Sequence, residues 1–135
     1  MLMDRKLVFF IDDDKIILDL LEYTFQSRDG IEVKTFSSGE EGLEKIIELN
    51  PDLVVLDYCF HKRGMSAMTG LDTLKKINEH NKNIPVIMLT SEKDEEIINN
   101  FRQYGAYKYV CKDSYFIDTL LETINEELFA REDHK

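Results

Sequence analysis

The sequence predicts an α/β protein with a doubly wound, five-stranded parallel sheet. Five short runs of apolar, β-branched or aromatic residues alternate with five segments whose apolar residues recur at helical spacing. Runs such as VFFI and LVVL are apolar at consecutive positions, which is typical of strands covered on both faces. Strict alternation of strand and helix implies right-handed crossovers and an open parallel sheet. At 135 residues, the chain fits a single domain.

The expected strands come at regular intervals along that domain, whose core we place at about residues 5–130. They are predicted at residues 7–11, 31–36, 53–56, 86–89 and 107–111. Between and after them, apolar stripes with a helical period predict helices around residues 16–25, 43–47, 71–77, 97–104 and 116–128. The expected start and stop signals are Ser37 or Ser38 before the second helix, Asp113 or Ser114 before the last, and Gly30 and Gly105 after helices.

Composition excludes several classes of function. The formal net charge of -10 argues against nucleic acid as a direct ligand, because a phosphate backbone is normally met by excess Lys and Arg. The two cysteines, Cys59 and Cys111, have no ligand-like spacing with histidine and are interpreted as reduced thiols, which predicts a cytoplasmic protein. The apolar run at residues 7–11 is too short to span a bilayer, so we expect no membrane insertion.

Chemically active side chains follow four of the five expected strands. They are Asp12 and Asp13 after the first, Asp57 after the third, Thr90 and Ser91 after the fourth, and Lys112 after the fifth. Ligands of such sheets bind at the carboxyl ends of the strands. Three carboxylates meeting at one edge repel each other, so we expect either raised pKa values or a bound divalent cation, for which Mg²⁺ is the natural candidate. With a hydroxyl and an ammonium beside them, the set is suited to phosphoryl transfer onto an aspartate.

Each of these residues also has a purely structural interpretation. The run Asp12 to Asp14 could only cap the first helix, and Thr90 or Ser91 could only cap the helix that covers residues 93–104. Lys112 could be an ordinary surface lysine. The placement of all of them at one sheet edge favours the functional interpretation.

These motifs together resemble the receiver domains of two-component response regulators. The resemblance covers nearly the whole chain, through KLVFFIDDD, PDLVVLD, IPVIMLTS and GAYKYVCK. It implies a flavodoxin-like (βα)5 fold with strand order 2-1-3-4-5. It also implies a signalling domain that is not an enzyme but assists its own phosphorylation and dephosphorylation.

The resemblance assigns the metal site and the phosphoacceptor. Asp57 matches the family's phosphoacceptor, and Asp12 and Asp13 match its acidic pair. By this likeness Asp13, Asp57 and the backbone carbonyl of Cys59 would bind Mg²⁺ (or Mn²⁺) directly, with Asp12 acting through water.

The resemblance also assigns the switch. Thr90 matches the switch hydroxyl, Tyr109 the switch aromatic, and Lys112 the lysine that faces the phosphoryl group. Cys59 and Glu92 occupy the two positions that tune dephosphorylation in the family.

Two departures from the family pattern lie close to these residues. The connection from Tyr58 to Thr69 is five residues longer than usual before Gly70, and it carries His61 where the family has a proline. Asp113 stands where the family has a proline after the lysine, and that proline usually follows a cis peptide.

The implied phosphodonor is a sensor histidine kinase or a histidine phosphotransfer protein, and the output is a downstream protein target. A phosphorylation-dependent homodimer is compatible with the family. Two alternatives stay open. One is a degenerate receiver that acts only as an interaction module. The other is a small phosphohydrolase of the haloacid dehalogenase type, because the segment FFIDDDK also fits that family's Asp-x-Asp motif. A flavodoxin-type flavin module fits less well, because no phosphate-binding loop rich in Ser, Thr or Gly follows the first strand.

Overall fold

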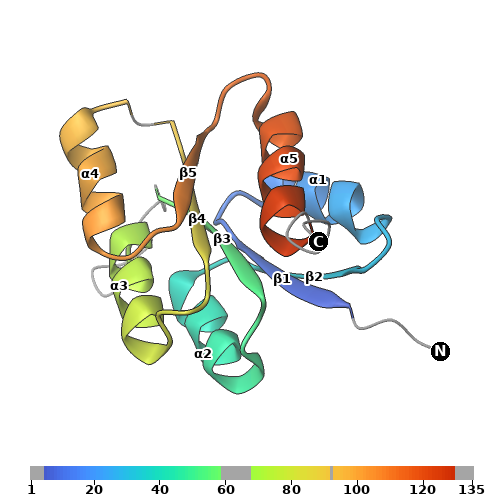
Figure 1. Ribbon diagram of the computed structural model, residues 1–135, viewed down its shortest axis with the longest axis horizontal. Coiled ribbons are helices and arrows are strands. Elements are labelled where there is room, and N and C mark those ends of the chain that lie inside the picture. Colours follow the sequence, from blue (N-terminus) through green and yellow to red (C-terminus); the bar gives the residue numbers. More distant parts are fainter. Residues whose placement is uncertain (1–4, 59–67, 92, 130–135) are drawn as a thin grey trace, which may run out of the picture.

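A five-stranded parallel sheet forms the centre of the molecule, with its strands in the order β2-β1-β3-β4-β5 (Figure 1). The structure is a computed structural model, and it describes residues 5–58, 68–91 and 93–129. The elements are β1 (Lys6–Ile11), α1 (Lys15–Gln26), β2 (Ile31–Phe36), α2 (Gly39–Leu49), β3 (Leu53–Asp57), α3 (Gly70–His80), β4 (Val86–Thr90), α4 (Glu95–Gln103), β5 (Lys108–Cys111) and α5 (Phe116–Leu128). The predicted fold class and strand order are confirmed.

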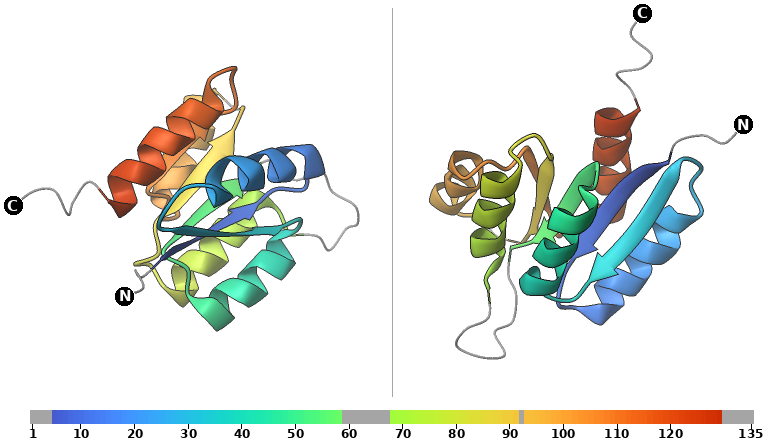
Figure 2. Two further views of the ribbon diagram at one scale, coloured as in Figure 1. Left: turned by 90° about the vertical axis from the view of Figure 1, so that its right-hand side faces the viewer. Right: turned by 90° about the horizontal axis from the view of Figure 1, so that it is seen from below.

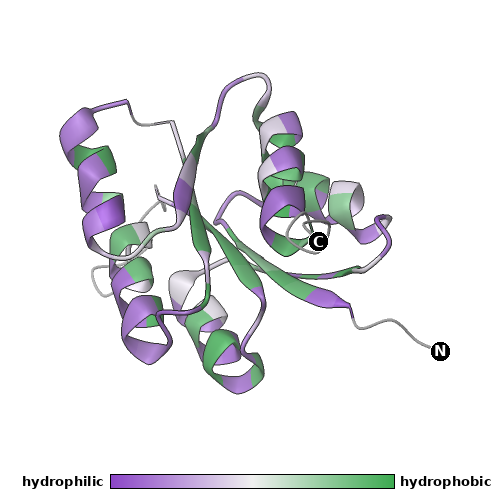
Figure 3. Cartoon of the chain, viewed as in Figure 1, coloured by the Kyte–Doolittle hydropathy of each residue, from purple (hydrophilic) through white to green (hydrophobic). Residues whose placement is uncertain are grey.

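Helices cover both faces of the sheet (Figure 2). α1 and α5 pack on one face, and α2, α3 and α4 pack on the other. Apolar residues are concentrated in the strands and on the sheet-facing sides of the helices, whereas the outer sides are largely polar (Figure 3). The central strands β3 and β4 are buried along their whole length, which explains why their sequences are apolar without alternation.

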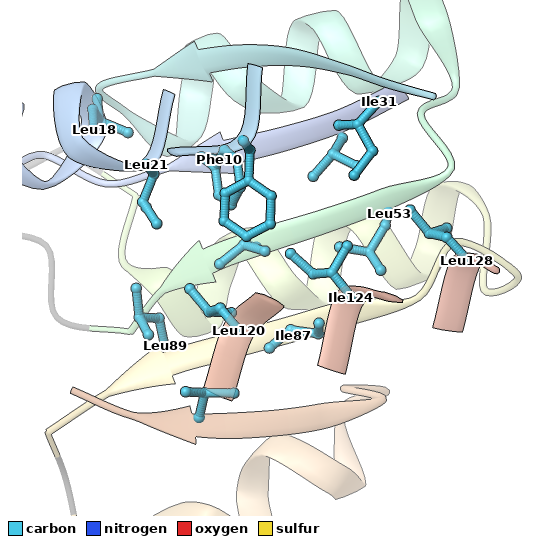
Figure 4. Packing of buried hydrophobic residues seen from close by; sticks show 14 residues of the cluster. Phe10, Leu18, Leu21, Ile31, Leu53, Ile87, Leu89, Leu120, Ile124 and Leu128 are labelled. Atoms are coloured by element: carbon cyan, nitrogen blue, oxygen red, sulfur yellow. The ribbon is translucent and has the colours of Figure 1, made fainter. Parts of the chain in front are cut away.

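Phe10 lies in the centre of the core on the α1 and α5 side (Figure 4). Its ring is fully buried, and its centroid is 5.2 Å from that of Phe25 in α1. We expect Phe10→Ala to lower the free energy of unfolding by about 3–5 kcal/mol, because it leaves a cavity in a closely packed core. Urea denaturation would measure the loss. Tyr23→Ala, at an exposed position of α1, is the control and should change stability by about 0.5 kcal/mol or less.

The helices begin at polar caps. Ser38 caps α2 as one of the two predicted residues, and Thr69 caps α3 in a reciprocal capping box with Asp72. Asn50 ends α2 in the left-handed conformation with φ 48°, and Gly105 follows α4 with φ 102°. These positions separate the helices from the strands that follow them.

Several boundaries differ from the prediction: β1 starts one residue earlier, β3 and β4 end one residue later, and three further differences concern α4, α5 and β5. α4 begins at Glu95 with Asp94 as its cap, so Thr90 and Ser91 do not cap it. α5 is preceded by Tyr115, which supplies no side-chain cap, so neither Asp113 nor Ser114 is the capping residue. β5 starts at Lys108 rather than one residue earlier. Each difference arises because several nearby residues could cap or extend an element, and packing selects one of them.

No helix in the described part of the chain is long and apolar enough to cross a membrane. Cis peptide bonds are likewise absent from the described residues.

Candidate phosphorylation site

Three carboxylates from two strands meet at the carboxyl edge of the sheet. Asp12 and Asp13 follow β1, and Asp57 is the last residue of β3. One oxygen of each lies within 4.8 Å of the others. Asp12 and Asp57 are almost fully buried, at 1% exposed each. The cluster that the sequence predicted at this edge is therefore present.

Within the run Asp12 to Asp14, the capping role and the role in the carboxylate cluster belong to different residues. Asp14 caps α1, and its side chain accepts hydrogen bonds from the backbone N–H groups of Ile16 and Ile17. The backbone N–H of Asp14 donates in turn to Oδ1 of Asp12 at 2.9 Å. The capping residue thus helps to orient Asp12, whose carboxylate belongs to the cluster.

Lys112 bridges two of the carboxylates. Its Nζ is 2.9 Å from Oδ1 of Asp57 and 3.3 Å from Oδ2 of Asp12. Burial opposes the charge of Lys112, but the hydrogen bond and charge of Asp57, with those of Asp12, outweigh burial and raise the pKa of Lys112. Lys112 therefore stays a cation at neutral pH, and it is not an ordinary surface lysine.

Negative charge exceeds positive charge at this edge. Burial raises the pKa of Asp12, although the Asp14 N–H and Lys112 both oppose the rise. Oδ2 of Asp12 is buried, and the ammonium of Lys112 is its ion-pair partner. Several buried carboxylate oxygens around one space form the hard donor set that Mg²⁺ prefers. The residues present thus fit a divalent cation.

The remaining predicted residues fall into two groups. Thr90 ends β4 and is buried at 1% exposed, whereas Tyr109 of β5 is 41% exposed. The backbone N–H of Lys112 donates to the Thr90 carbonyl at 2.8 Å, which places both residues at the edge that holds Asp57. Cys59, Glu92 and His61 lie outside the described residues.

Gly70 has a structural role that its place in the sequence pattern did not reveal. A Cβ at this position would lie 2.6 Å from the carbonyl oxygen of Tyr58 and closer still to that of Asp57. α3 can therefore start against the backbone of the acceptor only with glycine at its first position. The requirement comes from a tertiary contact, so local sequence contains no signal for it.

We expect Gly70→Ala to displace the backbone at Asp57 and to lower both stability and phosphorylation. The stability loss should be about 1–3 kcal/mol, because the obstructing atoms are backbone. Gly105→Ala is the control, since it strains a position with φ 102° beside Asn78, on a different segment. Unfolding and phosphorylation measured together would contradict this prediction if both variants lost stability but kept the wild-type phosphorylation rate.

Two further residues near the site were missed by sequence analysis. Oε2 of Glu40 in α2 accepts a hydrogen bond from the Met68 N–H at 2.7 Å, so it holds the end of the long connection after Asp57. The ring of Tyr58 packs edge-on against Phe101 of α4, with centroids 5.1 Å apart. Glu40 and Met68 are 28 residues apart, and only the fold brings them together.

Comparison with known proteins agrees with this geometry. The model of the response regulator receiver domain matches residues 8–125. The chain is 37% identical over 127 residues to the protein-glutamate methylesterase/protein-glutamine glutaminase of Bacillus subtilis, covering 92% of this chain and 34% of that protein. It is 37% identical over 109 residues to the alkaline phosphatase synthesis transcriptional regulatory protein PhoP of Bacillus subtilis, covering 80% and 42%. The chain thus spans less than half the length of these relatives.

Solved structures of receiver domains match nearly the whole of this chain. A CheY-like receiver domain protein from Methanospirillum hungatei matches with a TM-score of 0.82 at 28% identity, covering 98% of this chain and 100% of that one. The chemotaxis protein CheY4 of Vibrio cholerae matches with a TM-score of 0.78 at 28% identity, covering 92% and 99%. The acidic cluster lies at the edge where receiver domains bind Mg²⁺. The chain belongs to the response-regulator receiver domains, the signalling domains of two-component systems.

Proposed function

We propose that this receiver takes a phosphoryl group on Asp57 from a phosphohistidine, in a step that requires Mg²⁺ (or Mn²⁺). The observation that carries the proposal is that Nζ of Lys112 lies 2.9 Å from Oδ1 of Asp57, whose carboxylate lies within 4.8 Å of those of Asp12 and Asp13. A buried aspartate that meets both a fixed cation and an acidic metal-binding pair is arranged as a nucleophile toward phosphorus.

In the proposed step, a carboxylate oxygen of Asp57 forms a bond to phosphorus while the bond from phosphorus to the donor's imidazole nitrogen breaks. The electron pair of that bond stays with the imidazole. Lys112 offsets the charge of the transferred group on the side facing β5. A divalent cation, when bound, neutralises the carboxylates and the oxygens around phosphorus. Asp13, Asp57 and the backbone carbonyl of Cys59 would hold it directly, and Asp12 would hold it through water.

After transfer, the Thr90 hydroxyl would move toward the phosphorylated Asp57, and the Tyr109 ring would turn inward. The 41% exposure of Tyr109 leaves its ring room to become more buried. Glu92 and Cys59 would tune the loss of the phosphoryl group, in which the domain itself assists. The surface around Tyr109 that these movements change would bind a downstream protein in the cytoplasm, or a second phosphorylated copy of the chain.

Acetyl phosphate with Mg²⁺ tests the proposal without any partner. The protein is expected to gain the mass of one phosphoryl group, and peptide mapping after borohydride reduction should place the modification at Asp57. Omission of Mg²⁺, or addition of EDTA, should prevent it. An adduct at Asp12 would favour the phosphohydrolase alternative, and no adduct would favour a degenerate receiver.

An exposed apolar stripe on α1 supports a protein as the phosphodonor. Ile16 and Tyr23 are 78% and 77% exposed, and Leu20 between them is 42% exposed. Spacings of four and three residues place the three side chains on one face of the helix. α1 begins directly after Asp14, so the stripe starts at the rim of the acidic cluster. A donor protein that brings phosphohistidine to Asp57 would contact this rim, and the stripe offers it an apolar surface.

We expect Ile16→Asp to slow phosphoryl transfer from a phosphorylated histidine phosphotransfer protein that serves wild type, by roughly tenfold or more. The rate with acetyl phosphate should not change, because the side chain points away from the core. Ile47→Asp on α2 is the control, since Ile47 is also exposed but lies on the opposite face of the sheet. Equal losses with both phosphodonors would contradict a docking role.

A further inference from the structure

Asp113 uses both of its backbone polar groups and its side chain within the short connection between β5 and α5. Its N–H donates to the carbonyl of Cys111 at 2.8 Å, and its carbonyl accepts from the N–H of Phe116 at 3.2 Å. Its Oδ1 accepts from the N–H of Tyr115 at 2.9 Å. The residue directly before it is Lys112.

The first of these bonds fixes the backbone of Lys112. A hydrogen bond from Asp113 to Cys111 closes a three-residue turn with Lys112 at its centre. On the other side, the Lys112 N–H donates to Thr90 at 2.8 Å. The direction in which Lys112 leaves the strand, and therefore the 2.9 Å contact of its Nζ with Asp57, depends on this turn.

The carboxylate of Asp113 forms a local turn just before α5. Tyr115 precedes the helix but gives no side-chain hydrogen bond. Asp113 instead forms a local turn with the Tyr115 N–H, as Asp side chains do at positions two residues before a donor. A proline at this position could not donate the hydrogen bond to Cys111, because it has no N–H.

We propose that Asp113 is a positioning residue for Lys112: its Oδ1 holds the Tyr115 N–H and so steadies the turn centred on Lys112, and it acts through this hydrogen bond rather than through its charge. The inference rests on the proposed function, in which Lys112 faces the phosphoryl group. It assigns a role to one of the two positions where this chain departs from the family pattern.

Three variants separate geometry from charge. Asp113→Ala removes the Oδ1 acceptor, whereas Asp113→Asn keeps an oxygen acceptor but removes the charge. With acetyl phosphate and Mg²⁺, we expect Asp113→Ala to slow phosphorylation roughly tenfold, because a small displacement of a reacting group is costly. Asp113→Asn should retain nearly the wild-type rate. Ser114→Ala, at the exposed neighbouring position, is the matched control and should have no effect.

A double-mutant cycle tests whether Asp113 acts through Lys112. In a Lys112→Ala background, Asp113→Ala should cause no further loss, because the group that it positions is gone. Additive losses would overturn the proposal, as would an Asp113→Asn variant as slow as Asp113→Ala. Urea unfolding of each variant shows whether an altered rate reflects a folded protein.

Calorimetric titration with Mg²⁺ alone gives a readout that needs no phosphorylation. A displaced Lys112 competes less with the metal, so Asp113→Ala should bind Mg²⁺ more tightly. Loss of a nearby negative charge would weaken binding instead, and it would do so equally in Asp113→Asn. Weaker binding in both variants overturns the positioning role. A wild-type protein that takes no phosphoryl group at Asp57 would refute the proposed function, while this titration still tests the turn.

Discussion

Asp57→Asn is expected to abolish the phosphoryl adduct formed with acetyl phosphate and Mg²⁺. The amide has the size of the carboxylate but is not a nucleophile toward phosphorus. The substitution also removes one negative charge from a cluster of three carboxylates within 4.8 Å, so the free energy of unfolding should not fall. Intact-mass measurement and urea denaturation on the same preparation would check both results.

Asp52→Asn is a suitable control, since Asp52 lies at the opposite end of β3 and accepts a hydrogen bond from the Leu7 N–H at 2.7 Å. Its amide oxygen can still accept that bond, and the adduct should form as in wild type. A persistent adduct in Asp57→Asn would move the acceptor to another residue and refute the proposed role.

Lys112→Ala is expected to slow phosphorylation by roughly 10²–10³-fold, as loss of one preorganised charge-stabilising group does in related chemistry. The Nζ of Lys112 lies 2.9 Å from Oδ1 of Asp57, the proposed acceptor. Its removal should have the opposite effect on the metal. With no ammonium between Asp12 and Asp57, the carboxylates repel each other more strongly, and the affinity for Mg²⁺ should rise.

The prediction requires the phosphorylation rate to fall while the affinity for Mg²⁺ rises. Rate measurements with acetyl phosphate would be paired with calorimetric titration of Mg²⁺. Lys108→Ala is the control, because Lys108 is also on β5 but pairs with Glu126 at 3.8 Å on the surface. A variant that loses both rate and metal affinity would indicate that Lys112 mainly holds the site together.

The fold could be predicted because its signals are local. Consecutive apolar residues in β3 and β4 indicate strands covered on both faces, and the helical spacing of apolar residues from Ile16 to Phe25 predicts α1. The buried side of α1 was predicted only in part, because Leu18 faces the core whereas Ile16 and Leu20 of the same stripe are exposed. The pairing of Asp57 with Lys112 was predictable only as proximity, since every parallel strand delivers its last residue to the same edge.

Contacts between elements decided the rest. Sequence could not distinguish Asp14, which caps α1, from Asp12, which joins the cluster, because both are acidic residues before one helix. It likewise offered Asp113 or Ser114 as the cap of α5, whereas the structure uses the Asp113 side chain in the turn after Lys112.

By itself, the amino-acid sequence determined the order of strands and helices and the identity of the groups at the sheet edge. Both follow from periodicity and from the direction of parallel strands. Only the tertiary structure decided that Lys112 contacts both Asp57 and Asp12, that Gly70 must lack a side chain, and that Glu40 holds Met68. Such contacts depend on how far each crossover carries the chain and how closely its helices pack, and no local pattern encodes those distances.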